Sequence, residues 1–411
     1  MDLQQHLEAR ANMGIAAKIE DSAAAPKLPL LLCAVGAVIE GFDLQAASVT
    51  APFFSKELDM SIAQTGYAFT LNTLGLFIGA MLGGWAADRW GRKPVLVLSV
   101  ASFGLFCLCN AMANSIETFL GWRFLVGLGL GGALPNLIAL AAESGPARTR
   151  SRRVIIMSAG MPMGGALISA LIASGALHGW REVFIVGGIM PLAVALLMQV
   201  FLRGDSPVVA DSQTALTNPG FASLFQEDYR TKTILLWLGF CLTLGIIYLV
   251  LNWLPTLLIE RGFDKKQAII VALCFNFFGA LGAALLAFVL HRLGAFRTYL
   301  FTYIGLIVST GGLALIGNAP LPVFIAGGLI GVFVLGAQFL LYGLAADIYE
   351  VRIRGLGVGS AVSIGRMGSV AGPAAATAIL AAGYGPNAVL LGIIPTAILA
   401  LVCALFLLKQ H

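Results

Sequence analysis

The stretch GWAADRWGRK, residues 84–93, joins two long apolar segments through one acidic and several basic side chains. A related stretch, HRLG at residues 291–294, lies 203 residues after DRWG. A second pair of stretches, LAAE at 140–143 and LAAD at 344–347, is separated by 204 residues, and an R-x-R motif follows each member. Two matches at nearly one offset indicate that the chain contains two copies of the same unit, arranged in the same order.

The composition places both copies in a membrane. The chain has 411 residues, of which 59% are hydrophobic and 11% charged, and its mean hydropathy is +0.91. Soluble domains carry about 25% charged residues, so lipid must cover much of this surface. The 49 glycines favour close packing of helices within lipid. The six cysteines all lie in apolar stretches without a C-x-x-C pair, and we expect free buried thiols without a metal site.

Apolar segments of about 20 residues, the length that crosses a bilayer, recur along the chain. One longer break, rich in Pro, Ser, Thr and Asp, divides them into two sets of six. We expect an N-terminal cytoplasmic segment at 1–27, a six-helix bundle at 28–202, a cytoplasmic linker at 203–231 and a second six-helix bundle at 232–408. The twelve expected spans are 28–54, 62–87, 94–113, 117–141, 153–176, 181–202, 232–258, 266–290, 296–317, 321–345, 355–382 and 385–408.

The basic residues predict the orientation, because cytoplasmic loops are enriched in Lys and Arg. With both termini cytoplasmic, 18 of the 25 Lys and Arg residues lie on the cytoplasmic side, five lie outside and two lie within spans. The exceptions, on the outer side, are Lys56, Arg181, Arg261, Lys265 and Lys266. The N-terminal segment has no cleavable signal pattern, so we expect the first span to be retained. Six spans return the chain to its starting side, so the bundles are parallel repeats with a binding site expected between them.

Four ionisable side chains lie deep within the expected spans: Glu40, Asp43, Arg123 and Arg366. Each costs at least about 2.5 kcal/mol to insert, so each is a candidate functional residue. Glu40 and Asp43 share a helix face, and Asp43 lies at nearly the same expected depth as Arg123. Either carboxylate is therefore a possible partner of Arg123, as a fixed ion pair or as a group that titrates during transport. Asp43 is the first choice as proton carrier and Glu40 the second, since the four histidines lie at termini or span ends.

Arg366 lies near the expected midplane without an acidic residue nearby in its own span. A guanidinium keeps its charge and binds a carboxylate bidentately, so we expect Arg366 to hold a substrate carboxylate. The alternative is an arginine satisfied by backbone carbonyls or by Glu40. A ligand cavity also needs apolar walls with a few polar groups. Helix packing alone would explain some of the candidate residues. The candidates are Gln45, Asn136, Tyr248, Asn252, Trp253, Asn276, Gln338 and Tyr342.

Charged residues at the expected cytoplasmic ends of the spans suggest a gate. Asp88 and Glu143 are acidic residues at positions where positive-inside anchoring alone predicts basic ones. We expect them to latch a cytoplasmic gate together with the basic residues of the same loops, Arg89, Arg92 and Arg148.

Residues 84–93 resemble the G-x-L-A-D-R-x-G-R-K signature of the major facilitator superfamily, with Ala86 in place of the leucine. EGFDLQAA at 40–47 looks like the acidic first-helix motif of its aromatic acid:proton symporters. The stretches most similar to the 3-(3-hydroxyphenyl)propionate carriers of that family are Arg123 with GGALPN at 131–136, NWLP at 252–255, and RGLGVG at 354–359 with Gly365, Arg366 and Gly368. The resemblance implies a major facilitator fold, an all-α membrane protein with twelve transmembrane helices in two parallel six-helix repeats around a central cavity. It also implies essential roles for Asp43 and Glu40.

Two positions depart from the pattern. His291 stands where the repeat predicts Asp, and LRGDSP at 202–207 lacks the first proline of the related L-P-E-S motif. Neither departure touches the expected site.

The expected function is proton-coupled uptake of a small aromatic carboxylate, such as a hydroxyphenylpropionate or a hydroxybenzoate, by a monomer in the cytoplasmic membrane. The rivals are an organic-anion exchanger or uniporter, a drug exporter and a metabolite-sensing receptor. An enzyme is disfavoured because no nucleophile–base group, metal cluster or P-loop is present in the sequence. We expect no cofactor, with the proton gradient as the driving force, and no nucleic-acid partner. The ring pattern, the proton stoichiometry and the choice between Glu40 and Asp43 stay open.

Overall fold

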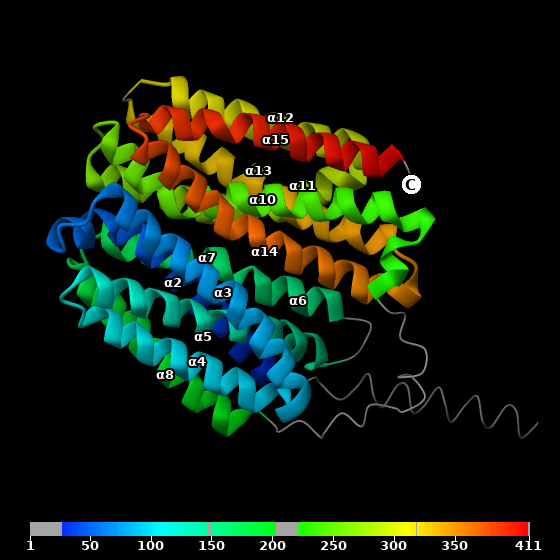
Figure 1. The fold of residues 1–411 in the computed structure, drawn as a ribbon, viewed down its shortest axis with the longest axis horizontal. Helices are drawn as coiled ribbons and strands as arrows, with labels where there is room; N and C mark the ends of the chain where they lie inside the picture. Colours follow the sequence, from blue (N-terminus) through cyan, green and yellow to red (C-terminus); the bar gives the residue numbers. More distant parts are fainter. Residues whose placement is uncertain (1–26, 146–149, 203–220, 318, 410–411) are drawn as a thin grey trace, which may run out of the picture.

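The computed structural model describes residues 27–145, 150–202, 221–317 and 319–409. All regular secondary structure in these residues is helical, and Figure 1 shows the later helices of the chain gathered above the earlier ones. The expected segment 1–27, nearly all of which precedes these residues, and the first part of the expected linker lie outside the described residues.

The first half of the chain supplies seven described helices. Its fifth expected span, 153–176, consists of two shorter helices separated at Ala159. The helices are α2 (Lys27–Glu57), α3 (Ile62–Trp90), α4 (Arg92–Ala111), α5 (Ile116–Glu143), α6 (Arg150–Ser158), α7 (Gly160–Ala173) and α8 (Trp180–Phe201).

The second half begins with a short 3-10 helix, η2 (Phe221–Phe225), and α10 starts at Glu227, inside the segment expected as linker. Eleven described segments are long and apolar enough to cross a membrane, and one of them, Ile156–Ala173, runs across the break between α6 and α7. α14 has 31 residues but is less apolar, and it occupies the remaining expected span. The all-helical membrane fold is therefore as predicted. The long helices of this half are α10 (Glu227–Glu260), α11 (Lys265–Leu293), α12 (Ala295–Leu315), α13 (Pro320–Ile348), α14 (Val351–Ala381) and α15 (Pro386–Lys409).

The duplication seen in the sequence is also present in the backbone. Ser61 and Gln64 form a capping box that begins α3, and Asp264 and Gln267 form one that begins α11, 203 residues later. Described residues with positive φ fall into pairs at nearly the same spacing: Asp59 with Gly262, Gly91 with Gly294, and Gly175 with Gly383. The two halves therefore repeat their turns and caps as well as their helices.

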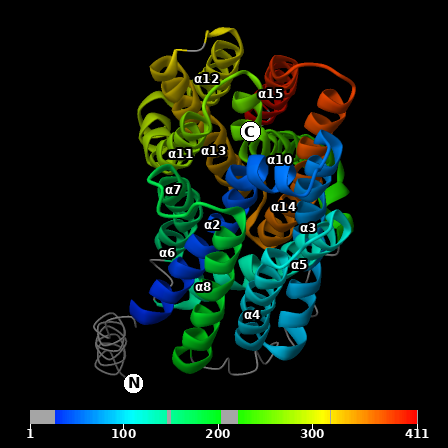
Figure 2. The same cartoon turned by 90° about the vertical axis from the view of Figure 1, so that its left-hand side faces the viewer.

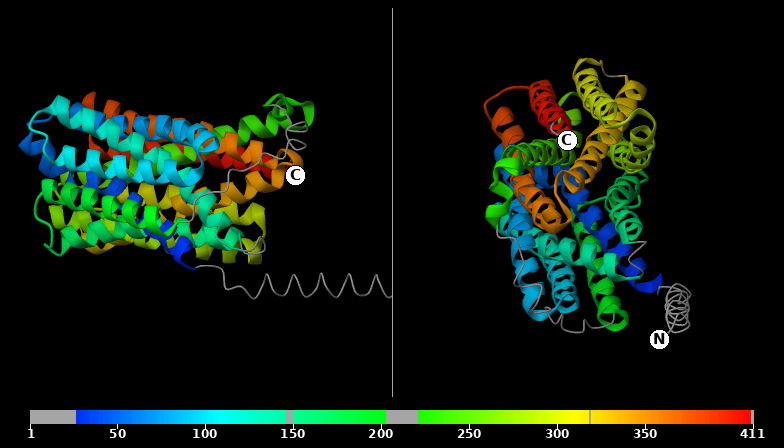
Figure 3. Two further views of the ribbon diagram at one scale, coloured as in Figure 1. Left: turned by 90° about the horizontal axis from the view of Figure 1, so that it is seen from below. Right: turned by 90° about the vertical axis from the view of Figure 1, so that its right-hand side faces the viewer.

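The two halves meet at one end of the bundle, where α2 and α10 finish and α3 and α11 begin; we call it the Glu57 end. There α2 packs on α10, α3 on α14 and α7 on α11. Figure 2 looks onto this end of the bundle, and Figure 3 shows the bundle from below and from the opposite end. The Phe69 ring meets the Trp253 ring at 5.3 Å, and the Lys265 ammonium lies 4.6 Å from the Phe53 ring. No comparable packing joins α5 to α13 within the described ranges. The ring and cation–π contacts between the described residues of the two halves lie toward the Glu57 end.

Close helix contacts hold the charged face of α2 in place. At Gly41, between Glu40 and Asp43, an added Cβ would lie 1.8 Å from the carbonyl oxygen of Met161 on α7. At Gly368 an added Cβ would lie 1.8 Å from the carbonyl oxygen of Cys241, which brings α14 equally close to α10. These small residues permit the backbone approach that membrane helices use for packing.

We expect Gly41→Ala to reduce thermal stability by about 1–3 kcal/mol or more, because the new methyl group collides with a backbone atom instead of a side chain. The measurement is thermal unfolding of the purified protein in detergent. Gly121→Ala on α5 is the matched control, since no atom lies within 4 Å of its Cβ position and alanine favours the helix. Equal melting temperatures for the two variants would show that α2 and α7 do not pack as described.

Candidate functional site

Asp43 of α2 and Arg123 of α5 form an ion pair in the interior of the first half. The Nη1–Oδ1 distance is 3.8 Å, and each side chain is 1% exposed. The Arg123 guanidinium also lies 5.5 Å from the centre of the Phe184 ring of α8, a favourable cation–π distance. Hydrogen bonding of the pair is incomplete, because Asp43 Oδ2 and Arg123 Nε and Nη1 have no hydrogen-bond partner in the described residues. The two charges attract each other without the bidentate geometry that would fix them.

A third residue touches this pair. The Cys107 thiol of α4 donates a hydrogen bond to Asp43 Oδ1, with a sulfur–oxygen distance of 3.5 Å. Both side chains are fully buried. The first half therefore surrounds Asp43 with one cation, one thiol and apolar side chains.

Glu40 lies one turn before Asp43 but interacts with the other half of the protein. It is buried, and neither carboxylate oxygen has a hydrogen-bond partner among the described residues. The charge of Arg366 on α14 acts on it electrostatically. Arg366 Nη1 donates a long, 3.4 Å hydrogen bond to the Tyr248 hydroxyl of α10, and no carboxylate of a described residue lies within ion-pair distance of it. The guanidinium thus keeps most of its donors for another anion.

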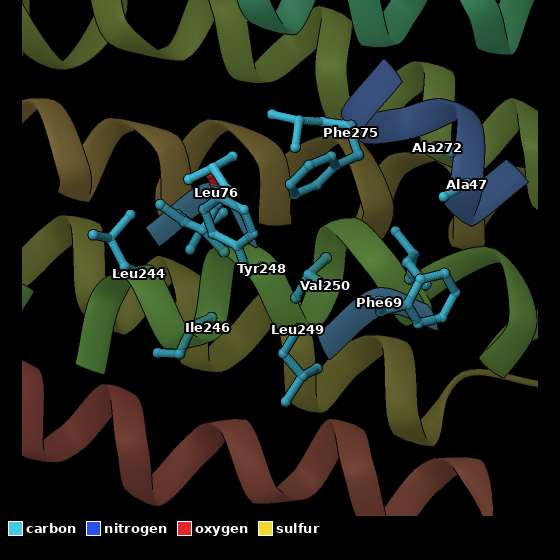
Figure 4. Close-up of a cluster of buried hydrophobic side chains, with 14 of the residues drawn as sticks. Ala47, Phe69, Leu76, Leu244, Ile246, Tyr248, Leu249, Val250, Ala272 and Phe275 are labelled. Carbon is cyan, nitrogen blue, oxygen red and sulfur yellow. The ribbon is translucent and has the colours of Figure 1, made fainter. Parts of the chain in front are cut away.

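Apolar and polar side chains lie together around Tyr248. Figure 4 shows its ring within a buried cluster that includes Leu76 of α3 and Phe275 of α11. Tyr342 of α13 packs edge-on against the Phe240 ring of α10, with the ring centres 5.4 Å apart. Such a mixture of apolar walls and few polar groups is typical of small-molecule sites.

Gln338 is a buried amide one turn before Tyr342 on α13, so the two side chains share a face of that helix. Neither its amide nitrogen nor its amide oxygen has a partner among the described residues. Because an unpaired buried amide is unfavourable, Gln338 is suited to hydrogen-bond a substrate.

Three other candidates are bonded to helix backbone. Asn136 donates to the carbonyl oxygen of Gly132 at 2.8 Å, and Asn252 donates to that of Tyr248 at 2.7 Å. The Trp253 indole donates to the Pro373 carbonyl oxygen of α14 at 3.3 Å. These bonds use one of the two amide N–H donors of each asparagine and the single N–H of the indole. The role of the three residues as substrate ligands stays a prediction.

Gln45 and Asn276 bond to each other across the two halves. Asn276 Nδ2 of α11 donates to Gln45 Oε1 of α2 at 2.8 Å and to the Ala272 carbonyl oxygen at 2.9 Å. The Asn276 amide also lies against Gly165 of α7, where an added Cβ would be 2.5 Å from Oδ1. Both amides are buried, so they form a polar bridge between the two halves.

Comparison with known proteins decides the family. The family model described as Major Facilitator Superfamily matches residues 33–342. The chain belongs to the major facilitator superfamily. It is 38% identical to the 3-(3-hydroxy-phenyl)propionate transporter of Escherichia coli (strain K12), over 93% of this chain and 94% of that one. It is 31% identical to the 4-hydroxybenzoate transporter PcaK of Pseudomonas putida, over 91% and 90% of the two chains.

A solved structure agrees on the fold. The crystal structure of a D-xylose-proton symporter matches with a TM-score of 0.75 at 16% sequence identity, over 92% of this chain and 96% of that one. The predicted major facilitator fold is therefore confirmed. The family and the similar proteins are transporters, and this chain is accordingly a membrane transporter and not an enzyme.

In this transporter, Asn276→Ala removes the amide bridge and is expected to favour separation of the halves at the Glu57 end. A net hydrogen bond of about 1 kcal/mol corresponds to roughly a fivefold change in population. Thr377→Cys supplies the reporter, because Thr377 of α14 packs against Gly66 of α3 across the halves. The measurement is the rate at which a membrane-impermeant maleimide labels the cysteine introduced by Thr377→Cys, after subtraction of the labelling of the six native cysteines. We expect Asn276→Ala to make this rate about fivefold faster.

Asn110→Ala is the control for that labelling, since Asn110 is another buried amide within a span but lies on α4, within the first half. Unchanged labelling after Asn276→Ala would show that the Gln45–Asn276 bond does not hold this transporter closed at the Glu57 end.

The expected gate of this superfamily member is described only in part. The Arg89 guanidinium stacks over the Trp85 ring at 4.8 Å, and Arg92 begins α4. The side chains of Asp88 and Glu143, and Arg148 as a whole, lie outside the described residues. The latch therefore stays a prediction. Where the structure describes side chains, no group of three or more His, Cys, Asp or Glu residues is arranged to hold a metal.

Sequence reasoning missed two residues of this transporter's site. In the sequence, Cys107 does not differ from the other cysteines in apolar stretches; its contact with Asp43 depends on how α4 packs beside α2. Gly165 is likewise one of many glycines, and its contact with Asn276 is visible only in the structure. The sequence offered one hint for Cys107: it lies in an expected span, 94–113, and a neighbouring span contains the buried charge of Asp43.

Proposed function

We propose that the protein carries a small aromatic carboxylate into the cell together with protons by alternating access. The observation that supports coupling best is the buried Asp43–Arg123 pair with its incomplete hydrogen bonding. Similar proteins are named for 3-(3-hydroxyphenyl)propionate and 4-hydroxybenzoate, which share an aromatic ring and a carboxylate. That shared chemistry is the reason to propose an aromatic acid as the substrate.

Arg366 would hold the substrate carboxylate. Its fork of N–H donors matches the two oxygens of a carboxylate, and its long bond to Tyr248 is easily replaced by a shorter charged one. The ring of the substrate would then lie against the apolar cluster beside Tyr248, with Gln338 and Tyr342 as partners for ring hydroxyl groups. Glu40 would be the negative charge that Arg366 faces when no substrate is bound.

Asp43 would carry the proton. As a carboxylate it is attracted to Arg123, and protonation removes that attraction. α2 packs both on α7 and α8 of its own half and on α10 of the other half. A change in the Asp43–Arg123 ion pair between α2 and α5 would therefore shift the equilibrium between the arrangements of the two halves. A ligand or proton shifts such an equilibrium only by its different affinity for the two states. Glu40 is the second candidate for this role.

The proposed location is the cytoplasmic membrane, with both termini in the cytoplasm and the Glu57 end outside. Arg89 and Arg92 lie at the opposite end of the bundle, as the positive-inside rule requires. In that orientation the described arrangement is closed toward the outside. We propose that a monomer is sufficient.

The proposal is tested by uptake into proteoliposomes with labelled 3-(3-hydroxyphenyl)propionate and 4-hydroxybenzoate. With an alkaline interior, uptake above that of protein-free liposomes is expected, and a protonophore is expected to abolish it. Protein-free liposomes are required because these acids also cross lipid in neutral form. The second candidate, an exchanger, would instead require an internal organic anion and ignore the pH gradient.

A further inference from the structure

The thiol of Cys107 is the hydrogen-bond donor nearest to the proposed proton carrier. It donates to Asp43 Oδ1 at 3.5 Å, and among the described residues it is the one side chain that hydrogen-bonds this carboxylate. Arg123 approaches the same oxygen at 3.8 Å, beyond hydrogen-bond distance, and Oδ2 has no partner. The donor that meets the charge directly is therefore a thiol.

A thiol is a weak donor. A donor that bonds the charged form of a carboxylate stabilises that form against protonation, and a stronger donor does so more. A serine at this position would bond the carboxylate more tightly, and an alanine would not bond it at all. The donor on α4 thus determines how strongly the protein favours the charged state of Asp43.

We infer that Cys107 is a positioning residue that adjusts how readily Asp43 gains and releases its proton during transport. The inference rests on the proposed function, because it requires Asp43 to be the group that is protonated. It adds a residue of α4 to a site whose charges come from α2, α5 and α14.

The other groups around Asp43 are the same in every Cys107 variant. Arg123 of α5 is the cation that faces it, and Glu40 lies one turn away on α2 under the influence of Arg366. Phe184 of α8 covers Arg123 and carries no charge. A change in pH dependence after substitution of Cys107 therefore reports on the donor itself.

The experiment compares protein-dependent uptake over a range of external pH for the wild type, Cys107→Ser and Cys107→Ala. Uptake is lost when the pH becomes too high to protonate the carrier. With serine the midpoint of this loss is expected at lower pH, and with alanine at higher pH, each by the order of half a pH unit or more. Gel filtration and substrate binding establish that each variant is folded.

Cys33→Ser and Cys109→Ser are the matched controls. Cys33 is a buried free thiol on α2, and Cys109 is a free thiol two residues from Cys107 on α4; neither hydrogen-bonds Asp43. Both controls are expected to keep the wild-type midpoint. If Cys107→Ser folds poorly, Cys107→Ala still tests the inference, because its midpoint is expected to move to higher pH.

The outcomes separate the inference from the proposed function. Wild-type uptake that ignores pH overturns the proposed function and this inference with it. A pH-dependent wild type with unchanged midpoints in the Cys107 variants, or midpoints that both move in one direction, overturns the inference alone. Opposite shifts of the two variants, with unmoved controls, support it.

Discussion

Asp43→Asn is expected to reduce proton-driven accumulation to the level of protein-free liposomes while the protein still binds and exchanges substrate. Asparagine has nearly the shape of aspartate but accepts no proton at physiological pH. The proposed cycle needs Asp43 to alternate between a charged form beside Arg123 and a neutral form. The measurement is accumulation under an imposed pH gradient, with substrate exchange at equal pH measured on the same preparation.

The double variant Asp43→Asn with Arg123→Gln is the control for stability. Removing one partner of a buried pair leaves an unpaired charge that costs about 3–5 kcal/mol, whereas removing both does not. The double variant is expected to be folded and equally uncoupled. Wild-type accumulation by the single variant would exclude Asp43 as the proton carrier, and Glu40→Gln would then be the variant to test.

Arg366→Lys is expected to weaken binding of the carboxylate substrate by about 10- to 100-fold. Lysine keeps the positive charge but loses the planar fork that bonds both carboxylate oxygens. The loss of one charged hydrogen bond, about 1.5–3 kcal/mol, corresponds to that range. Binding of the acid and of its neutral amide is measured by calorimetry on the purified protein.

The neutral amide distinguishes a ligand contact from a structural one. If Arg366 binds the carboxylate, the lysine variant loses affinity for the acid and changes little toward the amide. Tyr248→Phe, which removes only the hydroxyl that Arg366 now contacts, is expected to have the smaller effect. Unchanged affinity for the acid in Arg366→Lys would assign this arginine to the structure of α10 and α14.

Several features of the fold followed from the sequence because they depend on local or repeated patterns. The DRWG and HRLG stretches at equal spacing correspond to Gly91 and Gly294, which have φ of 89° and 75° and end α3 and α11. Matching depths of Asp43 and Arg123 allowed their contact to be considered in advance, and the structure places them 3.8 Å apart. Apolar run length located the spans, although it did not reveal the separation of α6 from α7.

Features that depend on which helix faces meet were not predictable. Glu40 and Asp43 are three residues apart, so the sequence left either one as the partner of Arg123, and packing turns Glu40 toward the other half. The partner of Gln45 is Asn276, 231 residues away, and no pattern along the chain joins these two amides. The thiol of Cys107 gained a role only when α4 was seen beside α2.

Proton movement measured together with substrate entry tests the central claim most directly. Proteoliposomes with a pH-sensitive dye inside, and equal pH on both sides, receive 3-(3-hydroxyphenyl)propionate from outside. Coupled transport predicts internal acidification that is faster than in protein-free liposomes, rises with the amount of protein and is absent with Asp43→Asn. Substrate entry that depends on the protein without any protein-dependent acidification would contradict proton-coupled symport.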